Sequence, residues 1–204
     1  MFIKLYPENP NPRLINTIVD CLRNGGIIIY PTDTVYGIGC DLFNSKAVER
    51  IAEMRGMKTG KTTFSFICHD FSQLSQFTKP IPNHIFKIMR ANLPGPFTFI
   101  LEANNNVPRH IQSKRKTAGI RIPDNSITQM IVKEFGNPIM SSSVHDEDDI
   151  IEYTTDPELI YEKFQDKVDI IIDGGYGGNI PSTVVDCTRD EIIITREGKG
   201  ELIM

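Results

Sequence analysis

Apolar residues follow two patterns along this chain, and each pattern predicts one type of element. Consecutive apolar residues, many of them β-branched, predict buried strands, whereas apolar residues three and four positions apart predict helices with one buried face. The predicted strands are 2–6 at a sheet edge, 27–30, 63–68, 97–102, 117–122, 138–141, 168–172, and a hairpin of 183–187 with 192–196 closed by 188–190. The predicted helices are 14–24, 46–55 with Ser45 as its N-cap, 71–77, 85–91, 126–135 and 156–163.

The order of these elements predicts the fold class. Strands alternate with helices and a pair of strands ends the chain, which indicates an α/β or α+β domain with a mixed sheet. A chain of 204 residues, 40% of them hydrophobic, has the length of one domain and enough apolar residues for a normal core. No internal repeat or low-complexity linker divides it, so we expect a single domain over 1–204.

Charge and cysteine usage narrow the functional class. The formal net charge of -4 argues against a globally basic nucleic-acid binder but leaves a local basic lining open. The four cysteines are scattered without a C-x-x-C pair, which predicts reduced thiols and no metal site. Because no apolar stretch reaches the length of a signal peptide or a membrane span, we expect a soluble, cytoplasmic protein.

The stretch 25–41, GGIIIYPTDTVYGIGCD, is the first candidate site. A buried strand stops at Pro31 and leads into a polar, glycine-loosened segment that holds Thr32, Asp33, Thr34, Gly37 and Gly39. The ends of strands in open α/β sheets are where ligands usually bind. The alternative is an ordinary strand and turn, because Thr, Asp and Gly dominate turns for conformational reasons.

Hydroxyl groups and arginines also gather near the ends of other predicted strands. They are Arg121, Ser141, Ser142, Ser143, Ser182, Thr183 and Arg196. Together with Thr32 and Thr34 they suit a small anionic ligand, such as a nucleotide or an amino-acid carboxylate. A Ser-His-Asp hydrolase fits less well, because the chain has no G-x-S-x-G elbow and His145, two residues from Ser143, has no orienting acid in the sequence pattern.

The segment 56–62, GMKTGKT, resembles a phosphate-binding P-loop without matching it. Its first glycine is one residue too late, and the segment follows a predicted helix instead of a strand. Arg55, Lys58 and Lys61 still form a basic cluster that would hold phosphate as point charges, or else a solvated charged loop. No Asp/Glu cluster has metal-ligand spacing, which leaves open Mg²⁺ carried in with a triphosphate.

Five motifs in order carry a family resemblance. They are YPTDTVYGIGCD (30–41), PGPFT (94–98), GIRIP (119–123), PI (138–139) and STVVD (182–186), with Arg196 and Gly198 last. This set resembles the YrdC/YciO family over nearly the whole chain. The resemblance implies a single twisted mixed-sheet α/β (α+β) domain of YrdC/RibB-like type with a large central cavity. It also implies binding of ATP and RNA.

For the best-known family members the resemblance implies L-threonylcarbamoyladenylate synthase activity. Threonine, bicarbonate and ATP give threonylcarbamoyl-AMP and pyrophosphate, for the threonylcarbamoyladenosine modification of tRNA. The resemblance implies that Thr34 and Tyr36 face threonine, that Arg121 approaches its carboxylate, and that Ser143, Ser182 and Arg196 line the nucleotide side. With the residues singled out above, the candidate catalytic residues are Arg55, Lys58, Lys61, Ser143 and His145, the candidate threonine contacts are Thr32, Thr34, Tyr36 and Arg121, and the candidate nucleotide contacts are Ser141, Ser143, Ser182, Thr183 and Arg196.

Two departures resemble the YciO branch more than the synthases. The synthases carry K-x-R where this chain has Arg55-Gly56-Met57, and S-x-N where it has Ser143-Val144-His145. Losing a cation that neutralises developing phosphate charge costs on the order of a few kcal/mol of transition-state stabilisation, unless Lys58 or Lys61 replaces it.

Two further functions therefore stay open. One is a hydrolase that removes threonylcarbamoyl from tRNA, with His145 as general base for a water. The other is a non-catalytic double-stranded RNA-binding protein, with Lys114, Arg115 and Lys116 gripping the RNA backbone, although such a run is also typical of a solvated face. The acid-rich span 144–155 is a candidate mobile lid.

Overall fold

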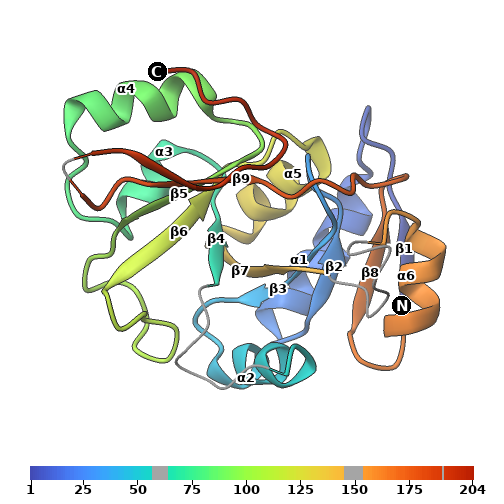
Figure 1. The fold of residues 1–204 in the computed structure, drawn as a ribbon. Helices are drawn as coiled ribbons and strands as arrows, with labels where there is room; N and C mark the ends of the chain where they lie inside the picture. Colours follow the sequence, from blue (N-terminus) through green and yellow to red (C-terminus); the bar gives the residue numbers. More distant parts are fainter. Residues whose placement is uncertain (57–63, 145–153, 190) are drawn as a thin grey trace.

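Ten strands of the described chain form one mixed sheet. The computed structural model describes residues 1–56, 64–144, 154–189 and 191–204. The strands are β1 (Phe2–Lys4), β2 (Ile28–Tyr30), β3 (Gly37–Asp41), β4 (Ser65–Ile67), β5 (Phe97–Glu102), β6 (Thr117–Arg121), β7 (Ile139–Ser143), β8 (Ile170–Asp173), β9 (Thr183–Asp186) and β10 (Ile193–Arg196). Their order across the sheet is β1-β8-β2-β3-β7-β4-β6-β5-β9-β10 (Figure 1).

The pairing of the strands confirms the predicted fold class. β1 and β2 lie parallel to β8, β4 lies parallel to β6, and β5 lies parallel to β9, while the other neighbours are antiparallel. The predicted edge strand is β1 at one end of the sheet, and the predicted hairpin is the antiparallel pair of β9 with β10 at the other. The chain is thus a single mixed α/β domain.

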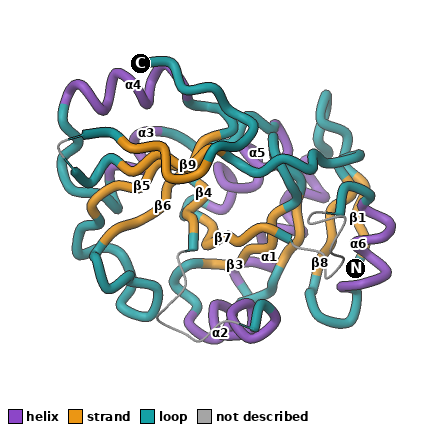
Figure 2. Tube along the Cα trace, in the orientation of Figure 1, coloured by secondary structure: helices purple, strands orange, loops and turns teal. Residues whose placement is uncertain are grey.

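Six helices of the described residues cover the sheet (Figure 2). They are α1 (Pro12–Arg23), α2 (Ser45–Met54), α3 (Phe71–Ser75), α4 (Asn83–Asn92), α5 (Ser126–Phe135) and α6 (Pro157–Phe164). Alternate residues of the strand region 27–30 belong to two different cores. Ile28 and Tyr30 pack with α1 and α5, whereas Ile27 and Ile29 belong to the core that includes α2, α3, α4 and α6. The strand is therefore buried on both faces, as its unbroken apolar run predicts.

One predicted cap is wrong by one residue. Asn44, not Ser45, caps α2, because its side-chain Oδ1 accepts a hydrogen bond from the Ala47 N–H at 3.0 Å. Asn and Ser are comparably good N-caps, so adjacent candidates are not separated by sequence alone. α1 ends at Arg23 with Asn24 as its C-cap, and the next residue, Gly25, has a φ of +78°, as is common after a helix.

The segment 37–41 differs from its interpretation as a loosened loop. It is the strand β3, paired with β2 on one side and β7 on the other. The glycines are required by close packing: a Cβ on Gly37 would lie 2.8 Å from a ring carbon of Tyr30, and one on Gly39 would lie 2.6 Å from Cγ2 of Ile139. The polar residues 31–36 are therefore a connection between two antiparallel strands, and the glycines let β3 lie against a buried tyrosine.

All four cysteines are free thiols in the structure, and burial raises the pKa of the Cys187 thiol to about 12. Within the described ranges no helix has the length and hydropathy needed to cross a membrane. The same ranges contain no group of three or more His, Cys, Asp and Glu placed to hold a metal ion.

Candidate functional site

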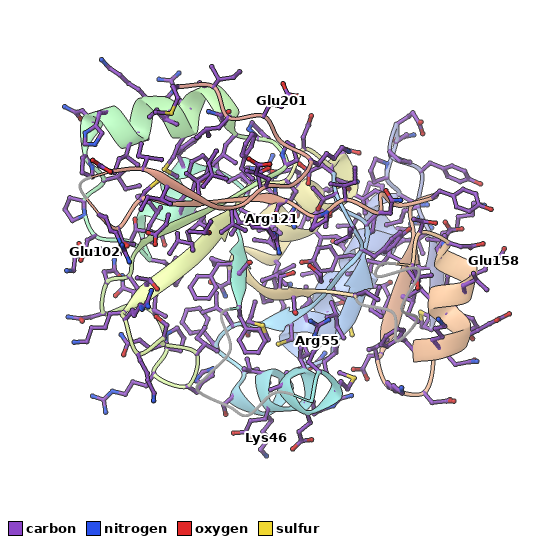
Figure 3. The ribbon with its side chains drawn as sticks, in the orientation of Figure 1. Lys46, Arg55, Glu102, Arg121, Glu158 and Glu201 are labelled. Atoms are coloured by element: carbon purple, nitrogen blue, oxygen red, sulfur yellow. The ribbon has the colours of Figure 1, made fainter. Side chains whose placement is uncertain are left out.

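A cavity of about 380 Å³ opens between the central strands and the β9–β10 hairpin. Its lining comes from seven strands or their ends and from the end of α2: Val35, Tyr36, Gly37, Arg55, Phe64, Ser65, Thr98, Ile100, Gly119, Arg121, Ser141, Ser142, Ser143, Ser182, Val184, Thr195 and Arg196. Figure 3 shows Arg121 near the centre of the molecule and Arg55 beside α2. The lining is rich in hydroxyls and contains three arginines, so it is suited to an anionic ligand.

Arg121 is the buried cation of this cavity. It ends β6 and is 7% exposed. Its Nη2 donates to Oδ1 of Asp33 at 2.9 Å and to Oγ1 of Thr34 at 3.0 Å. Its Nε is buried and has no hydrogen-bond partner among the described residues. A buried donor without an acceptor is uncommon in folded proteins, and here it lies on a guanidinium that lines a cavity.

In the connection 31–36, the side chains of Asp33 and Thr34 contact Arg121. Thr32 Oγ1 donates to the Val35 carbonyl at 2.6 Å and accepts from the Thr34 N–H at 3.0 Å, which closes a local turn. Thr34 Oγ1 then points at the guanidinium. Thr32 and Thr34, both predicted threonine contacts, are not part of the cavity lining.

Tyr36 lines the cavity, but its hydroxyl is bound elsewhere. Its O–H donates to the Gly175 carbonyl at 2.7 Å and its oxygen accepts from the Gly174 N–H at 3.2 Å. Burial raises the pKa of this phenol to about 12, so it stays neutral. Tyr36 therefore fixes the glycine loop 174–178 against the wall of the cavity and contributes shape to the site.

A row of serines forms the floor. Ser141, Ser142 and Ser143 come from β7, and Ser65 of β4 lies opposite Ser141 in the strand register. The hydroxyls of Tyr30 and Ser141 are hydrogen-bonded behind this floor. Burial raises the pKa of Tyr30 to about 12, so this neutral phenol fixes the orientation of the Ser141 hydroxyl.

Another wall of the cavity is formed by the hairpin of β9 and β10. Arg196 is exposed, and its Nη2 and Nε donate to the Ser182 carbonyl at 2.8 and 3.1 Å. Ser182 Oγ is 2.8 Å from Thr98 Oγ1. Thr183, predicted as a nucleotide contact, is instead turned to the C-terminal segment, because its Oγ1 donates to the Gly200 carbonyl at 2.6 Å.

Arg55 connects the cavity to a second one. Its Nη1 donates to the Ser143 carbonyl at 2.6 Å, and both residues also line a neighbouring cavity of about 760 Å³ beside α6. Lys58, Lys61 and His145, together with most of the predicted lid 144–155, lie outside the described residues.

The basic run is separate from the cavity. Lys114, Arg115 and Lys116 are exposed in the connection that precedes β6 and do not line it. β6 runs from Thr117 to Arg121, which places this connection roughly 13 Å along the strand from the buried arginine. Any RNA contact there is distinct from the ligand contacts inside.

Three lining residues with hydroxyl groups are not among the predicted site residues: Ser65, Thr98 and Thr195. Ser65 lies between Phe64 and Phe66, and Thr98 lies between Phe97 and Phe99. A single short hydroxyl in an otherwise apolar strand is the signal that marks both. The sequence does not show which face of the strand borders the cavity, so this signal acquires its meaning only from the register.

Known proteins resemble the chain over most of its length. The Sua5/YciO/YrdC family model, which carries the description "Telomere recombination", matches residues 20–198. YciO of Escherichia coli K12, an uncharacterized protein, is 41% identical over 203 residues, which are 98% of this chain and 97% of YciO. The crystal structure of E. coli YciO has a TM-score of 0.91 with 40% identity and covers 98% of this chain and 97% of that one.

Relatives with synthase names are less similar. The threonylcarbamoyl-AMP synthase of Coxiella burnetii RSA 493 is 32% identical over 180 residues, 88% of this chain and 95% of that protein. The crystal structure of Pyrococcus abyssi Sua5 in complex with L-threonine has a TM-score of 0.88 and 28% identity, and it covers 97% of this chain and 57% of that one. With a family model and full-length relatives in agreement, the chain belongs to the Sua5/YciO/YrdC family.

Proposed function

We propose that the cavity takes up L-threonine, bicarbonate and ATP and that the protein forms threonylcarbamoyl-AMP and pyrophosphate. The observation that carries the proposal is the buried guanidinium of Arg121. This residue lines the cavity, and its Nε donor has no hydrogen-bond acceptor among the described residues. A carboxylate is the ligand that such a cation prefers. The L-threonine complex of P. abyssi Sua5 and the synthase names of relatives at about 30% identity support this ligand class.

The reaction needs positioning and charge neutralisation more than side-chain chemistry. The threonine amine and bicarbonate condense to a carbamate with loss of water. A carbamate oxygen then attacks the α-phosphorus of ATP, the bond to the bridging oxygen breaks, and pyrophosphate leaves. Arg121 holds the carboxylate, while Ser182 and Arg196 face the nucleotide, so different parts of the lining align the two reactants. Mg²⁺ enters with the triphosphate.

A second candidate is a hydrolase that removes threonylcarbamoyl from tRNA. The surroundings of Arg55 favour it. Its guanidinium donates to the Ser143 carbonyl on the cavity wall, and the second cation of the synthase K-x-R motif is Met57 in this chain. Unless Lys58 or Lys61 replaces that cation, the protein is weaker at stabilising a leaving pyrophosphate, a group that removal of threonylcarbamoyl does not involve. In this case tRNA is substrate and partner in the same site.

Pyrophosphate release from purified protein distinguishes the two candidates. With ATP, threonine and bicarbonate together we expect release, and none when any one of the three is omitted. Arg121→Lys is expected to raise the KM for threonine by at least about tenfold. The lysine ammonium keeps the charge but lacks the planar guanidinium that donates hydrogen bonds to a carboxylate. The matched control is Arg90→Lys, an exposed arginine of α4 outside the cavity lining.

The hydrolase is tested on RNA that carries threonylcarbamoyladenosine. Loss of the modification without any pyrophosphate release would transfer the proposal to the second candidate. If neither reaction occurs, and neither threonine nor threonylcarbamoyl-AMP binds, the proposed function is wrong.

A further inference from the structure

We propose that Asp33 is a positioning residue, which holds Arg121 from behind and thereby makes the cavity select ligands with a carboxylate. The inference rests on the proposed function and deepens it: it names the residue that sets the selectivity of the amino-acid end of the site. Asp33 does not line the cavity, so it acts through Arg121.

Asp33 is fixed from three directions. Its Oδ1 accepts from Arg121 Nη2 at 2.9 Å, its Oδ2 accepts from the main-chain N–H of Asp124 at 3.0 Å, and its carbonyl accepts from Lys199 Nζ at 2.6 Å. These partners come from β6, from the connection that follows it, and from the C-terminal segment. Because both carboxylate oxygens are used by the protein itself, Asp33 is not placed to bind a ligand. Its hydrogen bonds instead fix the position of the Arg121 guanidinium.

The burial of Arg121 and Asp33 explains why the guanidinium needs a counter-charge from the protein. The side chains of Arg121 and Asp33 are each 8% exposed. A guanidinium at this depth without a counter-charge is strongly disfavoured, so it would turn toward solvent or lower the stability of the fold. Asp33 supplies the counter-charge before any ligand arrives. The protein itself therefore holds the cation in one position, and a ligand does not have to organise it.

The bonds already made define what the ligand must offer. Nη2 is occupied by Asp33 and Thr34, whereas Nε has no acceptor among the described residues. A carboxylate that enters beside the guanidinium supplies an acceptor and a full negative charge. A carboxamide supplies one weaker acceptor and an N–H₂ group that faces other donors. Sites built on hydrogen bonds reject such a mismatched analogue strongly, so we expect discrimination against the amide.

The test compares L-threonine with L-threoninamide, which has the same side chain and amine but no carboxylate. Binding of each compound is measured by calorimetry to the wild-type protein, Asp33→Asn and the control Asp166→Asn, an exposed aspartate of the connection after α6. We expect the wild type to prefer threonine by at least about tenfold and Asp33→Asn to lose most of that preference. Asp166→Asn is expected to keep the preference within about twofold.

The ratio of the two affinities separates positioning from general damage. If the role of Asp33 is purely structural, Asp33→Asn would bind both ligands more weakly by the same factor, and the ratio of the two affinities would not change. That result would overturn the inference. Asp33→Glu is the second variant in case Asp33→Asn does not fold, since it keeps the charge and displaces the carboxylate by one methylene; it too should lose the preference. Failure of the proposed function is a different result, in which the wild type binds neither compound.

Discussion

Arg121 and Arg196, which both line the cavity, differ in burial, in hydrogen-bond partner and in place within the sheet. Arg121 is 7% exposed, forms an ion pair of 2.9 Å with Asp33, and lies in the middle of the sheet. Arg196 is exposed, lies on the edge strand β10, and donates to a main-chain carbonyl of Ser182. One guanidinium is held by a buried charge and the other by neutral oxygen atoms of Ser182.

The difference in burial between Arg121 and Arg196 determines which kind of ligand group each of them can recognise. A buried cation that is paired with a carboxylate has a fixed geometry and is poorly screened by salt. It therefore distinguishes ligands by the shape and charge of the ligand group that contacts it. An exposed cation is mobile and screened, so it attracts phosphate charge without strict geometry. Under the proposed function we therefore expect the amino-acid carboxylate at the Arg121 wall and the nucleotide at the Arg196 wall.

The largest effect is expected on folding stability. Arg121→Ala removes one member of a buried ion pair and leaves Asp33 uncompensated, which lowers the free energy of unfolding by about 3–5 kcal/mol. Arg196→Ala removes hydrogen bonds at the surface and costs about 1 kcal/mol or less. Urea denaturation of both variants measures the two values. Equal losses would contradict the contrast between the walls.

A smaller effect tests the rigid floor that supports the Arg121 wall. In Gly39→Ala the new Cβ would lie 2.6 Å from Ile139 Cγ2 and 2.7 Å from the carbonyl oxygen of Met140. A backbone atom cannot move aside cheaply, so we expect a loss of about 1–3 kcal/mol in denaturation experiments. Gly119→Ala is the control, because its nearest contact would be a Thr98 methyl at 3.2 Å. A Gly39→Ala protein of wild-type stability would show that β3 is less tightly packed than described.

The third effect concerns nucleotide binding. We expect Arg196→Ala to weaken ATP binding about tenfold at low salt, since one charge-assisted contact is lost. The difference from wild type should shrink between about 50 mM and about 500 mM salt because the charge is exposed. Titrations with fluorescent ATP at both salt concentrations measure it. A difference independent of salt would place Arg196 in the same class as Arg121.

The smallest effect on the fold is expected for the basic run 114–116. Replacing all three residues by Ala should leave the unfolding midpoint and the threonine affinity unchanged. For RNA binding, the slope of log K against log salt should become shallower by about 2, because fewer phosphates are neutralised. The double variant Lys87→Ala/Arg90→Ala on exposed α4 is the control. An unchanged slope would assign 114–116 to an ordinary solvated face.

Sequence patterns predict the elements better than their packing. The spacing of Ile127, Ile131 and Phe135 predicts α5 with its observed bounds, because a helix of this length is buried along one apolar stripe. The glycines of β3 were interpreted as loosening the chain, whereas they admit the ring of Tyr30. Nothing local to 37–41 shows that ring, since a glycine required by close approach and one required by a turn look alike in a sequence.

The site shows the same limit. Arg121 and the segment that holds Asp33 were both candidates, because polar residues at strand ends are visible in the sequence. Their pairing joins residues 88 positions apart and depends on the strand order of the sheet, with β4, β7 and β3 between β6 and β2. Ser65 joins the site for the same reason. Residue types can be predicted locally, but partners and faces follow from topology.

The most direct measurement is a crystal structure of the protein with threonylcarbamoyl-AMP. We predict that the ligand carboxylate lies within hydrogen-bonding distance of Arg121 while Asp33 keeps its contact to Nη2, and that the adenylate lies against Ser182 and Arg196. The reversed orientation, with phosphate at Arg121, or a ligand outside the cavity, would contradict the account.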